Sequence, residues 1–452
     1  MQRIFKHISM EYIFNRKLYA KLLEWKKESN GQTAILIEGA RRVGKSTLVK
    51  QFAQNEYRSH ILIDFSKASR ETIALFDDLN NIDLLFITLQ NTYDTRLHNR
   101  QSVIIFDEVQ KCPRAREAIK YLVADGRYDY IETGSLISIR QNTESIVIPS
   151  EEERITMYPM DYEEFRWALG DEDSVQLLRM SYEQHLPLGA AHRRKMMDFR
   201  LYMLVGGMPQ AVSAYLNTNN FREVDKIKRQ IIRLYEEDFL KIDRSGKIGE
   251  LFMSIPAQLY RSAGRFVPFN AIGGAANTSI TDWMLALSES KTVLFSYHCS
   301  DPNVGMSLYK DISRYKIFLA DTGLFVTLCF WDKDYTENVI YSKLLSDKLD
   351  ANLGYIYENA VAQMLASSGN KLFYYTWAKD EKHNYEIDFL LSRGNKLVPI
   401  EVKSSGYKTH KSLDVFCEKY SSRIGERILL YTKDYCKDGQ TTCVPVYFTP
   451  FL

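Results

Sequence analysis

The segment EGARRVGKST, which ends at Thr47, has residue types and a spacing that suit phosphate binding. It fits the pattern G-x-x-x-x-G-K-[ST], in which glycines let backbone N–H groups approach phosphate oxygens. Lys45 would reach the β- and γ-phosphates of ATP, and Ser46 would hold Mg²⁺. The residues expected to contact the nucleotide are Gly39, Arg42, Gly44, Lys45, Ser46 and Thr47. An apolar run precedes the motif and a helical pattern follows it, which favours an ATP site over a glycine-rich turn with a chance lysine.

A second apolar run, VIIFDEVQ, contains two adjacent carboxylates, Asp107 and Glu108. In a parallel sheet these side chains would emerge at the same edge as the phosphate loop. Asp107 would hold Mg²⁺ through water, and Glu108 would orient and deprotonate the attacking water, which favours ATP hydrolysis over transfer to a small-molecule acceptor. A third run ends in IETGS, where Thr133 or Ser135 could sense the γ-phosphate. A simple strand-ending turn is the alternative for that third run.

Near the C-terminus, the stretch NYEIDFLLSRGNKLVPIEVKSS places Asp388 on one apolar run and a Glu-x-Lys on the next. Both runs alternate, and SRGN between them predicts a hairpin, so Asp388, Glu401 and Lys403 could converge on one side of an antiparallel pair. The two carboxylates are hard oxygen ligands that suit Mg²⁺, and Lys403 could position or deprotonate a hydrolytic water. The alternative is an ordinary half-buried hairpin with one polar face.

Together these motifs resemble the AAA-type prokaryotic ATPases that carry a C-terminal uncharacterised domain of restriction-endonuclease-like fold. The resemblance runs nearly end to end and rests on GARRVGKST, IIFDEVQ, TGS, YPMDYEEF, LVGGMPQAV, FLADTG, GYIYENAVAQML and EIDFLL…PIEVKSS. It implies that Glu358, Asp388, Glu401 and Lys403 match the PD-(D/E)XK nuclease pattern, with Glu358 on the helix YIYENAVAQML. Relatives that have lost catalysis commonly lose one of these four positions, so the residues present here suffice for cleavage if the metal site assembles.

The same resemblance directs attention to two arginines. In the family a glycine-arginine pair usually precedes the proline-containing stretch, whereas EEERITMYP has Arg154 with Glu153 in place of the glycine. Arg154 and Arg140 are the candidates for an arginine that touches the γ-phosphate, in cis or from a neighbouring subunit. Such a contact is worth about 10³ to 10⁵ in rate. A solvated surface arginine is the alternative for each, and the Glu153 departure favours that alternative.

Four short apolar runs, TAILIEGA, HILIDF, SVIIFDEV and YDYIETGS, alternate with helical stretches and predict the parallel sheet of an α/β P-loop domain. Helical spacing from Met10 to Glu28 predicts an amphipathic helix before them. Further along, the order helix, turn, helix, hairpin predicts a winged helix-turn-helix. The predicted domains are a P-loop ATPase core with the N-terminal helix at 1–160, a helical segment at 161–246, the winged helix-turn-helix at 247–330 and a nuclease-like α/β domain at 331–452.

Composition sets limits on the partners. The formal net charge of +2 over 452 residues argues against a protein that coats nucleic acid non-specifically, although it leaves a local basic patch open. The six cysteines form no CxxC pair and indicate reduced thiols. The N-terminus shows no apolar signal region, and no apolar run is long enough to span a membrane. These features predict a cytoplasmic protein with no membrane partner.

The sequence thus predicts an ATP-binding and ATP-hydrolysing switch that uses Mg²⁺ and controls a nucleic-acid-directed, Mg²⁺-dependent nuclease-like domain. The expected partner is nucleic acid, with DNA favoured over RNA, or a protein, and the ATPase domain offers a surface for an oligomer. The alternative is a signalling or interaction ATPase whose nuclease-like domain is catalytically silent.

Overall fold

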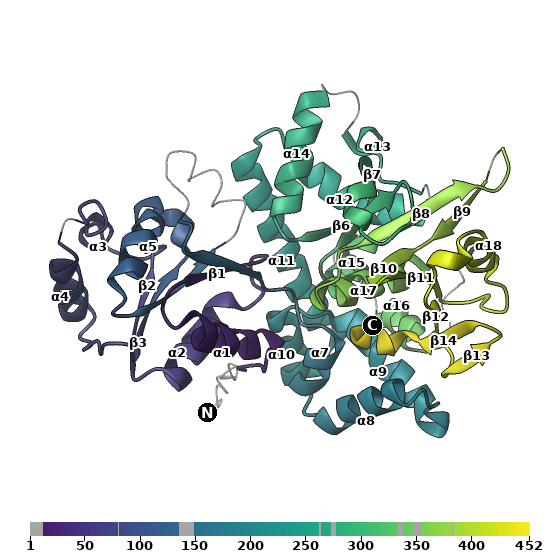
Figure 1. Cartoon of the computed structure of the whole chain (residues 1–452), viewed down its shortest axis with the longest axis horizontal. Helices are drawn as coiled ribbons and strands as arrows, with labels where there is room; N and C mark the ends of the chain where they lie inside the picture. Colours follow the sequence, from purple (N-terminus) through teal and green to yellow (C-terminus); the bar gives the residue numbers. More distant parts are fainter. Residues whose placement is uncertain are drawn as a thin grey trace, which may run out of the picture. The chain divides into compact units, whose positions relative to one another are not determined.

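The computed structural model describes residues 12–79, 81–134, 149–261, 264–272, 277–332, 338–346, 354–381 and 383–452 (Figure 1). The chain divides into two compact units, which we describe separately. The N-terminal unit comprises Ile13–Tyr158 and Glu289–Lys291, and the C-terminal unit comprises Pro159–Ser288 and Thr292–Leu452 together with Tyr12. Within the described ranges, no helix has both the length and the apolar character needed to cross a membrane.

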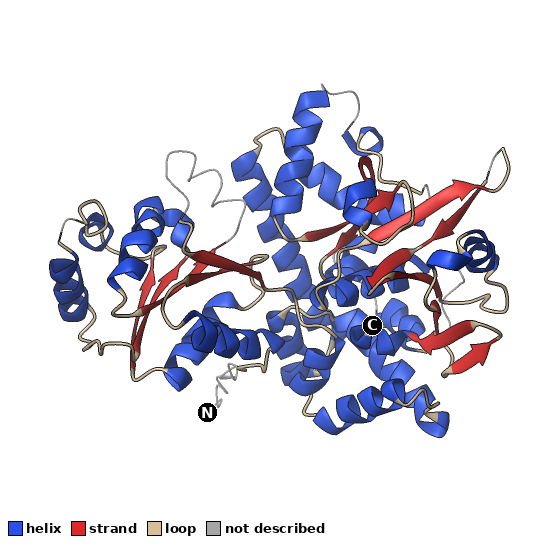
Figure 2. Cartoon of the chain, viewed as in Figure 1, coloured by secondary structure: helices blue, strands red, loops and turns tan. Residues whose placement is uncertain are grey.

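The N-terminal unit is built on one parallel sheet of five strands in the order β2-β3-β4-β1-β5. The strands are β1 Ala34–Glu38, β2 Ser59–Asp64, β3 Ser102–Asp107, β4 Asp129–Gly134 and β5 Glu152–Thr156. The helices are α1 Lys17–Ser29, α2 Lys45–Glu56, α3 Arg70–Ala74, α4 Ile82–Thr92 and α5 Pro113–Asp125. Helices and strands alternate along this part of the chain, as Figure 2 shows by colour, and the predicted α/β fold with a parallel sheet is confirmed.

Alternation along the strands explains why both faces of this sheet are covered. On β1, Ile35 and Ile37 pack in one apolar cluster with α1 and α2, whereas Ala34 and Leu36 pack in a second cluster with α4 and α5. Each face therefore buries apolar side chains under helices, which is what continuous apolar runs in a parallel sheet require. The carboxyl ends of β1, β3 and β4 are consequently held at one edge of a rigid layer.

Two local features of this unit differ from the sequence prediction. In the described part of the chain the first helix begins at Lys17, so Ile13 lies before it and is 58% exposed. Arg16, the residue before the helix, is in extended conformation. The strand β5 was not anticipated, because its residues are charged and only half-buried at the edge of the sheet. Such a strand shows no continuous apolar run.

The C-terminal unit begins with helices and ends with two sheets. The helices are α7 Tyr162–Ala168, α8 Glu172–Glu183, α9 His192–Val205, α10 Pro209–Thr218, α11 Phe221–Ile242, α12 Lys247–Tyr260, α13 Phe269–Ile272, α14 Asn277–Glu289, α15 Thr322–Cys329, α16 Asn338–Leu345, α17 Gly354–Ser367 and α18 Lys411–Lys419. The strands are β6 Val293–Cys299, β7 Lys310–Leu319, β8 Phe373–Ala378, β9 Asn384–Ile387, β10 Phe389–Arg393, β11 Lys396–Lys403, β12 Arg427–Tyr431, β13 Cys436–Asp438 and β14 Thr441–Pro445.

The strands of this unit join segments that are distant in the sequence. The antiparallel pair β6 and β7 follows α12, α13 and α14, but it continues into a four-stranded sheet in the order β7-β6-β8-β9. The other sheet has the order β10-β11-β12-β14-β13. The chain passes from one sheet to the other at Asp388, which lies between β9 and β10. The SRGN turn joins β10 to β11 as an antiparallel pair, as the sequence predicts.

Four of the motifs singled out in the sequence meet in one buried hydrogen-bond network. Asp321 accepts from the backbone N–H of Gly207 at 2.6 Å and caps α15. Asn359 bonds both backbone groups of Leu319, and Gln363 donates to the carbonyl of Met160 at 3.2 Å. The motifs YPM, GGMP, FLADTG and YENAVAQ thus connect helices and strands of the C-terminal unit, and their polar side chains satisfy backbone groups in its interior.

Candidate functional site

The phosphate loop connects the end of β1 to the start of α2, and its backbone has the conformations that the motif requires. Gly44 has φ 104° and Arg42 has φ 69°, both in the left-handed region. A Cβ at Gly39 would lie 2.4 Å from the carbonyl oxygen of Met157, so only glycine fits there. The helix α2 begins at Lys45, which places its N-terminal N–H groups at the loop, where they favour anions.

Lys45 is buried and its ammonium is held by the loop itself. Its Nζ donates to the carbonyl oxygens of Gly39 at 2.9 Å and Ala40 at 3.1 Å. Burial lowers the pKa of Lys45 to about 8, although the charges of Glu108 and Asp107 oppose that shift. A phosphate brought to the loop would supply the anionic partner that the two neutral carbonyls do not.

The carboxylate of Asp107, at the end of β3, lies beside the phosphate loop, as expected. Ser46 donates from Oγ to Oδ1 of Asp107 at 2.8 Å, and the hydroxyl of Thr133 donates to the same oxygen. Thr133 in turn accepts from the backbone N–H of Glu108 at 3.4 Å. The structure therefore brings together residues from α2, β3 and β4 at one edge of the sheet.

Glu108 adopts a backbone conformation that is uncommon for a residue with a side chain. Its φ is 56°, and its Oε2 accepts from Nε2 of Gln110 at 2.5 Å. Left-handed backbone at a non-glycine residue costs free energy and is often retained at functional sites. Gln110 was not anticipated from the sequence, and no signal in VIIFDEVQ marks it as the partner of Glu108.

Arg16 is a further residue that sequence reasoning missed. It is buried, and its guanidinium donates to the carbonyl of Val43 in the phosphate loop at 3.0 Å and to the carbonyl of Tyr158 at 2.6 Å. It therefore ties the loop to Tyr158, the residue at which the main segment of the N-terminal unit ends. Arginine presents several donors in a fixed geometry, which suits such a clamp.

The hydroxyl of Ser46 and the carboxylate of Asp107 are the hard oxygen donors that Mg²⁺ prefers, and they lie within hydrogen-bond distance of each other beside the phosphate loop. These residues fit Mg²⁺ bound together with a nucleotide. Thr47 is exposed on the first turn of α2, next to Ser46.

The proposed arginine contacts have a different outcome. Arg154 lies within β5, opposite Leu36 of β1, and its Nε donates to Glu152 at 2.7 Å. Glu152 also accepts two hydrogen bonds from the buried Arg116. It interacts with Glu132 as well, and burial raises the pKa of Glu132 well above its usual value. The structure thus pairs Arg154 inside the strand and does not place it with Lys45, Ser46 and Asp107. Glu153 accepts instead from the hydroxyl of Thr33 at 2.5 Å. Arg140 and Ser135 lie outside the described residues.

The predicted C-terminal residues come from three elements. Glu358 lies on α17, Asp388 lies between β9 and β10, and Glu401 and Lys403 lie on β11. Lys403 pairs with Glu401 at 2.9 Å, and Asp388 accepts from the backbone N–H of Val402 at 2.7 Å. Burial, followed by the charge of Glu358, raises the pKa of Asp388 well above its usual value.

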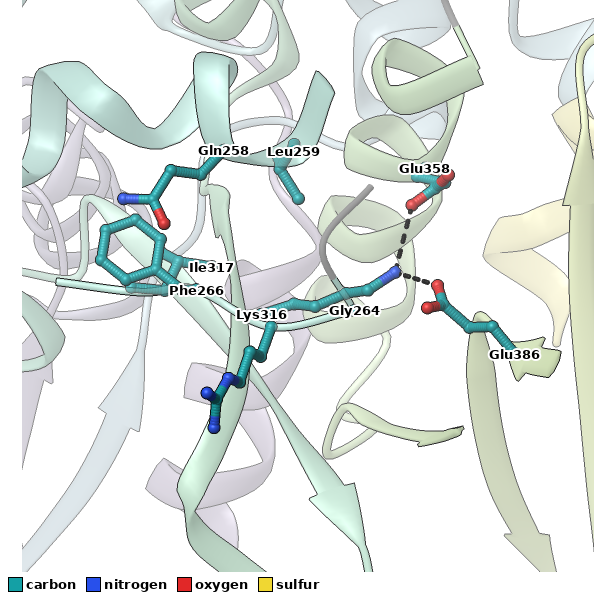
Figure 3. A pocket seen from close by; sticks show the side chains of 9 residues that line it. Gln258, Leu259, Gly264, Phe266, Lys316, Ile317, Glu358 and Glu386 are labelled. Carbon is teal, nitrogen blue, oxygen red and sulfur yellow. Dashed lines mark hydrogen bonds and ion pairs between the residues drawn. The ribbon is translucent and has the colours of Figure 1, made fainter. Parts of the chain in front are cut away.

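A lysine that the sequence did not suggest lies among these acids. Lys316 extends from β7, and its ammonium bonds Glu386 of β9 and lies 3.6 Å from Oε2 of Glu358 (Figure 3). Burial alone would lower the pKa of Lys316, but the charges of Glu386, Glu358 and Asp388 outweigh it and raise that pKa. Lys316 therefore stays protonated. Neither its position in RYKIFLADTG nor the spacing of that motif indicates such a contact.

The same carboxylates are the predicted ligands of a metal ion. Across the ranges that the structure describes, no group of three or more His, Cys, Asp or Glu side chains is arranged to hold a metal ion. The ammonium of Lys316 bonds Glu386 and lies 3.6 Å from Oε2 of Glu358, so a divalent ion at Asp388 and Glu401 would lie beside a cation that is already bound. In this arrangement the residues present do not fit Mg²⁺.

Family models match three separate parts of the chain. Residues 31–166 match an AAA domain, residues 196–335 match a domain of unknown function (DUF8612), and residues 353–448 match another domain of unknown function (DUF4143). No curated protein matches the chain. With the parallel five-stranded sheet, the first match shows an AAA-type ATPase domain of P-loop fold. That fold implies nucleotide binding.

Several solved structures are distantly similar. The Walker-type ATPase of Pyrococcus abyssi is 15% identical with a TM-score of 0.41, over 70% of this chain and 96% of that chain. The Aeropyrum pernix ORC1 protein in complex with DNA is 11% identical with a TM-score of 0.28, over 76% and 95%. The RuvB Holliday junction branch migration motor of Thermotoga maritima is 13% identical with a TM-score of 0.27, over 62% and 89%.

Proposed function

We propose that the chain is an ATP-hydrolysing AAA-type switch whose nucleotide state controls a nuclease-like C-terminal domain directed at nucleic acid. The observation that carries this proposal is the convergence of a phosphate loop with a strand-end carboxylate pair at one sheet edge. The residues that converge there are Lys45, Ser46, Asp107, Glu108 and Thr133.

The residues of this edge have separable roles in the proposal. The backbone of Gly39, Arg42 and Gly44 cradles the phosphates, and Lys45 exchanges its loop carbonyls for β- and γ-phosphate oxygens. Mg²⁺, when bound with ATP, neutralises charge on the phosphates. Asp107 and Ser46 would hold the ion, while Thr133 fixes the orientation of the Asp107 carboxylate.

Glu108 would accept the proton of the attacking water. Its carboxylate is oriented by Gln110, and its backbone N–H is held by Thr133, so both ends of the residue are fixed. A positioned general base contributes about 10² to 10⁴ in rate. Arg154 is 45% exposed and pairs with Glu152, so the proposed contact of this arginine with the γ-phosphate, in cis or from a neighbouring subunit, requires it to leave that partner.

The C-terminal unit supplies the output in this proposal. The order of α12, α13, α14, β6 and β7 supports a winged helix-turn-helix within residues 247–330, and β10, β11 and α17 support a nuclease-like domain within 331–452. Glu358, Asp388, Glu401 and Lys403 are the positions of the nuclease pattern. The proposed partner is nucleic acid, with DNA favoured over RNA, and an oligomer would form through the ATPase domain.

A second candidate function is favoured by one observation. The ion pairs of Lys316 with Glu386 and Glu358 place an ammonium beside one acid of the nuclease pattern, Glu358. That arrangement supports a signalling or interaction ATPase whose nuclease-like domain binds a protein or a nucleic acid without cutting it.

One experiment separates the two candidates. The full chain would be incubated with single- and double-stranded DNA and RNA in Mg²⁺ or Mn²⁺, each with ATP, ADP or a non-hydrolysable ATP analogue. Nucleotide-dependent cleavage that Asp388→Ala abolishes would establish the nuclease. Binding without cleavage, altered by the nucleotide, would establish the silent switch. A chain that neither binds nor hydrolyses ATP would contradict both.

A further inference from the structure

A pocket in the C-terminal unit is lined by Glu358, Glu386 and Lys316. The lysine comes from β7, a strand that contributes no residue to the nuclease pattern. Lys316 lies on β7, opposite Ser296 of β6, at one edge of the four-stranded sheet. Its side chain passes the ring of Tyr374 on β8, with Nζ 5.6 Å from the ring centroid, and reaches Glu386 on β9. The side chain of Lys316 therefore crosses the sheet from β7 to β9.

The pocket itself is lined by both ends of this ion pair. Lys316, Glu358 and Glu386 line it together with residues of α12 and of the segment after it (Figure 3). In Figure 3 the lysine points between the two carboxylates, with one dashed line to each. The further lining residues are Gln258, Leu259, Gly264, Arg265, Phe266 and Ile317.

The charges near this pocket come from three strands, one helix, the residue that links the two sheets, and the segment after α12, which contributes the guanidinium of Arg265. The carboxylates are Glu358, Glu386, Asp388 and Glu401, and the ammonium groups are Lys316 and Lys403. Lys403 is committed to Glu401, and Lys316 is committed to Glu386 and Glu358. Asp388 is bound to the backbone at Val402. Each carboxylate thus has at least one cationic or N–H partner, although Oε2 of Glu401 is buried without a hydrogen-bond partner.

We propose that Lys316 is the resident cation of this pocket and excludes a divalent metal ion, so that the C-terminal domain works as a metal-independent binding module. A divalent ion of this type needs carboxylate oxygens at about 2.0 to 2.6 Å. The ammonium already bonds Glu386 and lies 3.6 Å from Oε2 of Glu358, and a divalent ion held by Asp388 and Glu401 beside it would be repelled by this charge. Metal binding requires that Lys316 leave its two partners.

This inference rests on the second candidate function for the C-terminal domain and is independent of the ATPase site. Its test therefore measures metal binding and leaves cleavage aside. If the full chain hydrolyses ATP but binds Mn²⁺ in this pocket, the inference fails while the proposed switch survives. If ATP is not hydrolysed, the switch fails while the metal measurement still decides the inference.

The experiment is a titration of nucleotide-free full-length protein with Mn²⁺, followed by electron paramagnetic resonance and by thermal unfolding. Wild type should show no Mn²⁺ site that depends on Asp388. Lys316→Met removes the ammonium but keeps a long apolar stem, and it should create a Mn²⁺ site that binds at least about tenfold more tightly than wild type. Bound Mn²⁺ should also raise the melting temperature of this variant.

Three controls give the measurement its meaning. Lys310→Met changes an exposed lysine of the same strand and should behave as wild type. Lys316→Arg keeps a cation and should still exclude Mn²⁺. Adding Asp388→Asn to Lys316→Met should remove the new site, which separates it from any ion held at the phosphate loop.

Two results would overturn the proposal. One is a wild-type Mn²⁺ site that Asp388→Asn abolishes, because the ammonium and the metal would then coexist. The other is a folded Lys316→Met variant that gains no Mn²⁺ site, because Lys316 would then not be what excludes the ion. If Lys316→Met folds only when Mn²⁺ is added, the metal has replaced the lysine, as proposed. If that variant does not fold at all, the wild-type titration against Asp388→Asn decides alone.

Discussion

The two candidate sites contain the same kinds of side chain, yet their lysines have different partners. Lys45 donates to two neutral backbone carbonyls, whereas Lys316 and Lys403 are each bonded to carboxylates. A lysine held only by neutral acceptors gains a strong charge-assisted bond when a phosphate arrives. A lysine already paired with carboxylates has no such gain. The N-terminal site is thus prepared for an anion, whereas the lysines of the C-terminal pocket are already paired with carboxylates.

A second contrast concerns what the motifs do. In the N-terminal unit the motif residues gather at one edge of the sheet, where we propose the ATP site. In the C-terminal unit the motifs GGMP, FLADTG and YENAVAQ bond one another in the interior, through Asp321, Asn359 and Gln363. Motif residues of that unit are therefore expected to affect stability before activity.

The largest expected effect sharpens the first contrast. Lys45→Ala should weaken ATP binding by about 100-fold or more, because losing one partner of a buried charged hydrogen bond costs about 2 to 5 kcal/mol. Isothermal titration calorimetry with ATP would measure it. Lys50→Ala, an exposed lysine of the same helix, is the matched control and should bind ATP as wild type does. Equal affinity of Lys45→Ala and wild type would remove the distinction between the two sites.

The next effect tests the structural motifs of the C-terminal unit. A Cβ at Gly207 would lie 2.0 Å from the carbonyl oxygen of Met160, so Gly207→Ala should lower the free energy of unfolding by about 1 to 3 kcal/mol or more. Urea unfolding would measure the loss. Gly249→Ala lies in α12 with open space around its Cβ and should be neutral or stabilising. A Gly207→Ala chain as stable as wild type would show that the close approach is not needed.

A smaller effect follows from a histidine paired with acids. Burial alone would lower the pKa of His410, but Asp438 and Asp414 outweigh it and raise that pKa above 6.5. The stability that this pairing contributes is fully present below pH 6.5 and is lost as pH rises through the folded pKa. Because both carboxylates are exposed, the contribution should be at most about 1 kcal/mol. Unfolding of wild type and His410→Gln should therefore differ at pH 6 and converge at alkaline pH, and a gap that widens with pH would contradict the assignment.

The smallest expected effect is on ATP turnover in variants of the C-terminal pocket, which should change little. Asp388→Ala and Lys403→Ala alter only the C-terminal pocket, so each should leave ATP turnover within about twofold of wild type, since the two sites belong to separate units and share no partner residue. Steady-state phosphate release would measure it. A large loss of turnover in either variant would mean that the two sites are coupled in the catalytic step.

Much of the N-terminal site could be predicted because its residues are close together in the sequence. The phosphate loop lies between one strand and one helix. Asp107 ends another strand of the same parallel sheet, so its side chain emerges at the same edge as the loop. The parallel sheet followed from continuous apolar runs. The edge strand β5 was missed because its residues are mostly charged.

The C-terminal pocket could be predicted only in part. The hairpin of β10 and β11 followed from alternation and from the SRGN turn, so the positions of Asp388, Glu401 and Lys403 followed as well. Lys316 and Glu386 are 70 residues apart, and their bond depends on how four strands are ordered in one sheet. The motif residues indicate which acids belong to such a pocket, but they do not indicate that a lysine from another strand pairs with them. Arg16 was missed for the same reason, because it clamps a loop 27 residues further along the chain.

The most direct test of the account is a comparison of wild type with Glu108→Gln for both ATP binding and ATP turnover in Mg²⁺. The amide keeps the size of the side chain but cannot accept a proton from water. ATP affinity should stay within about threefold of wild type, and turnover should fall by about 10² to 10⁴. A Glu108→Gln chain that hydrolyses ATP at the wild-type rate would contradict the assignment of this sheet edge as the hydrolytic site.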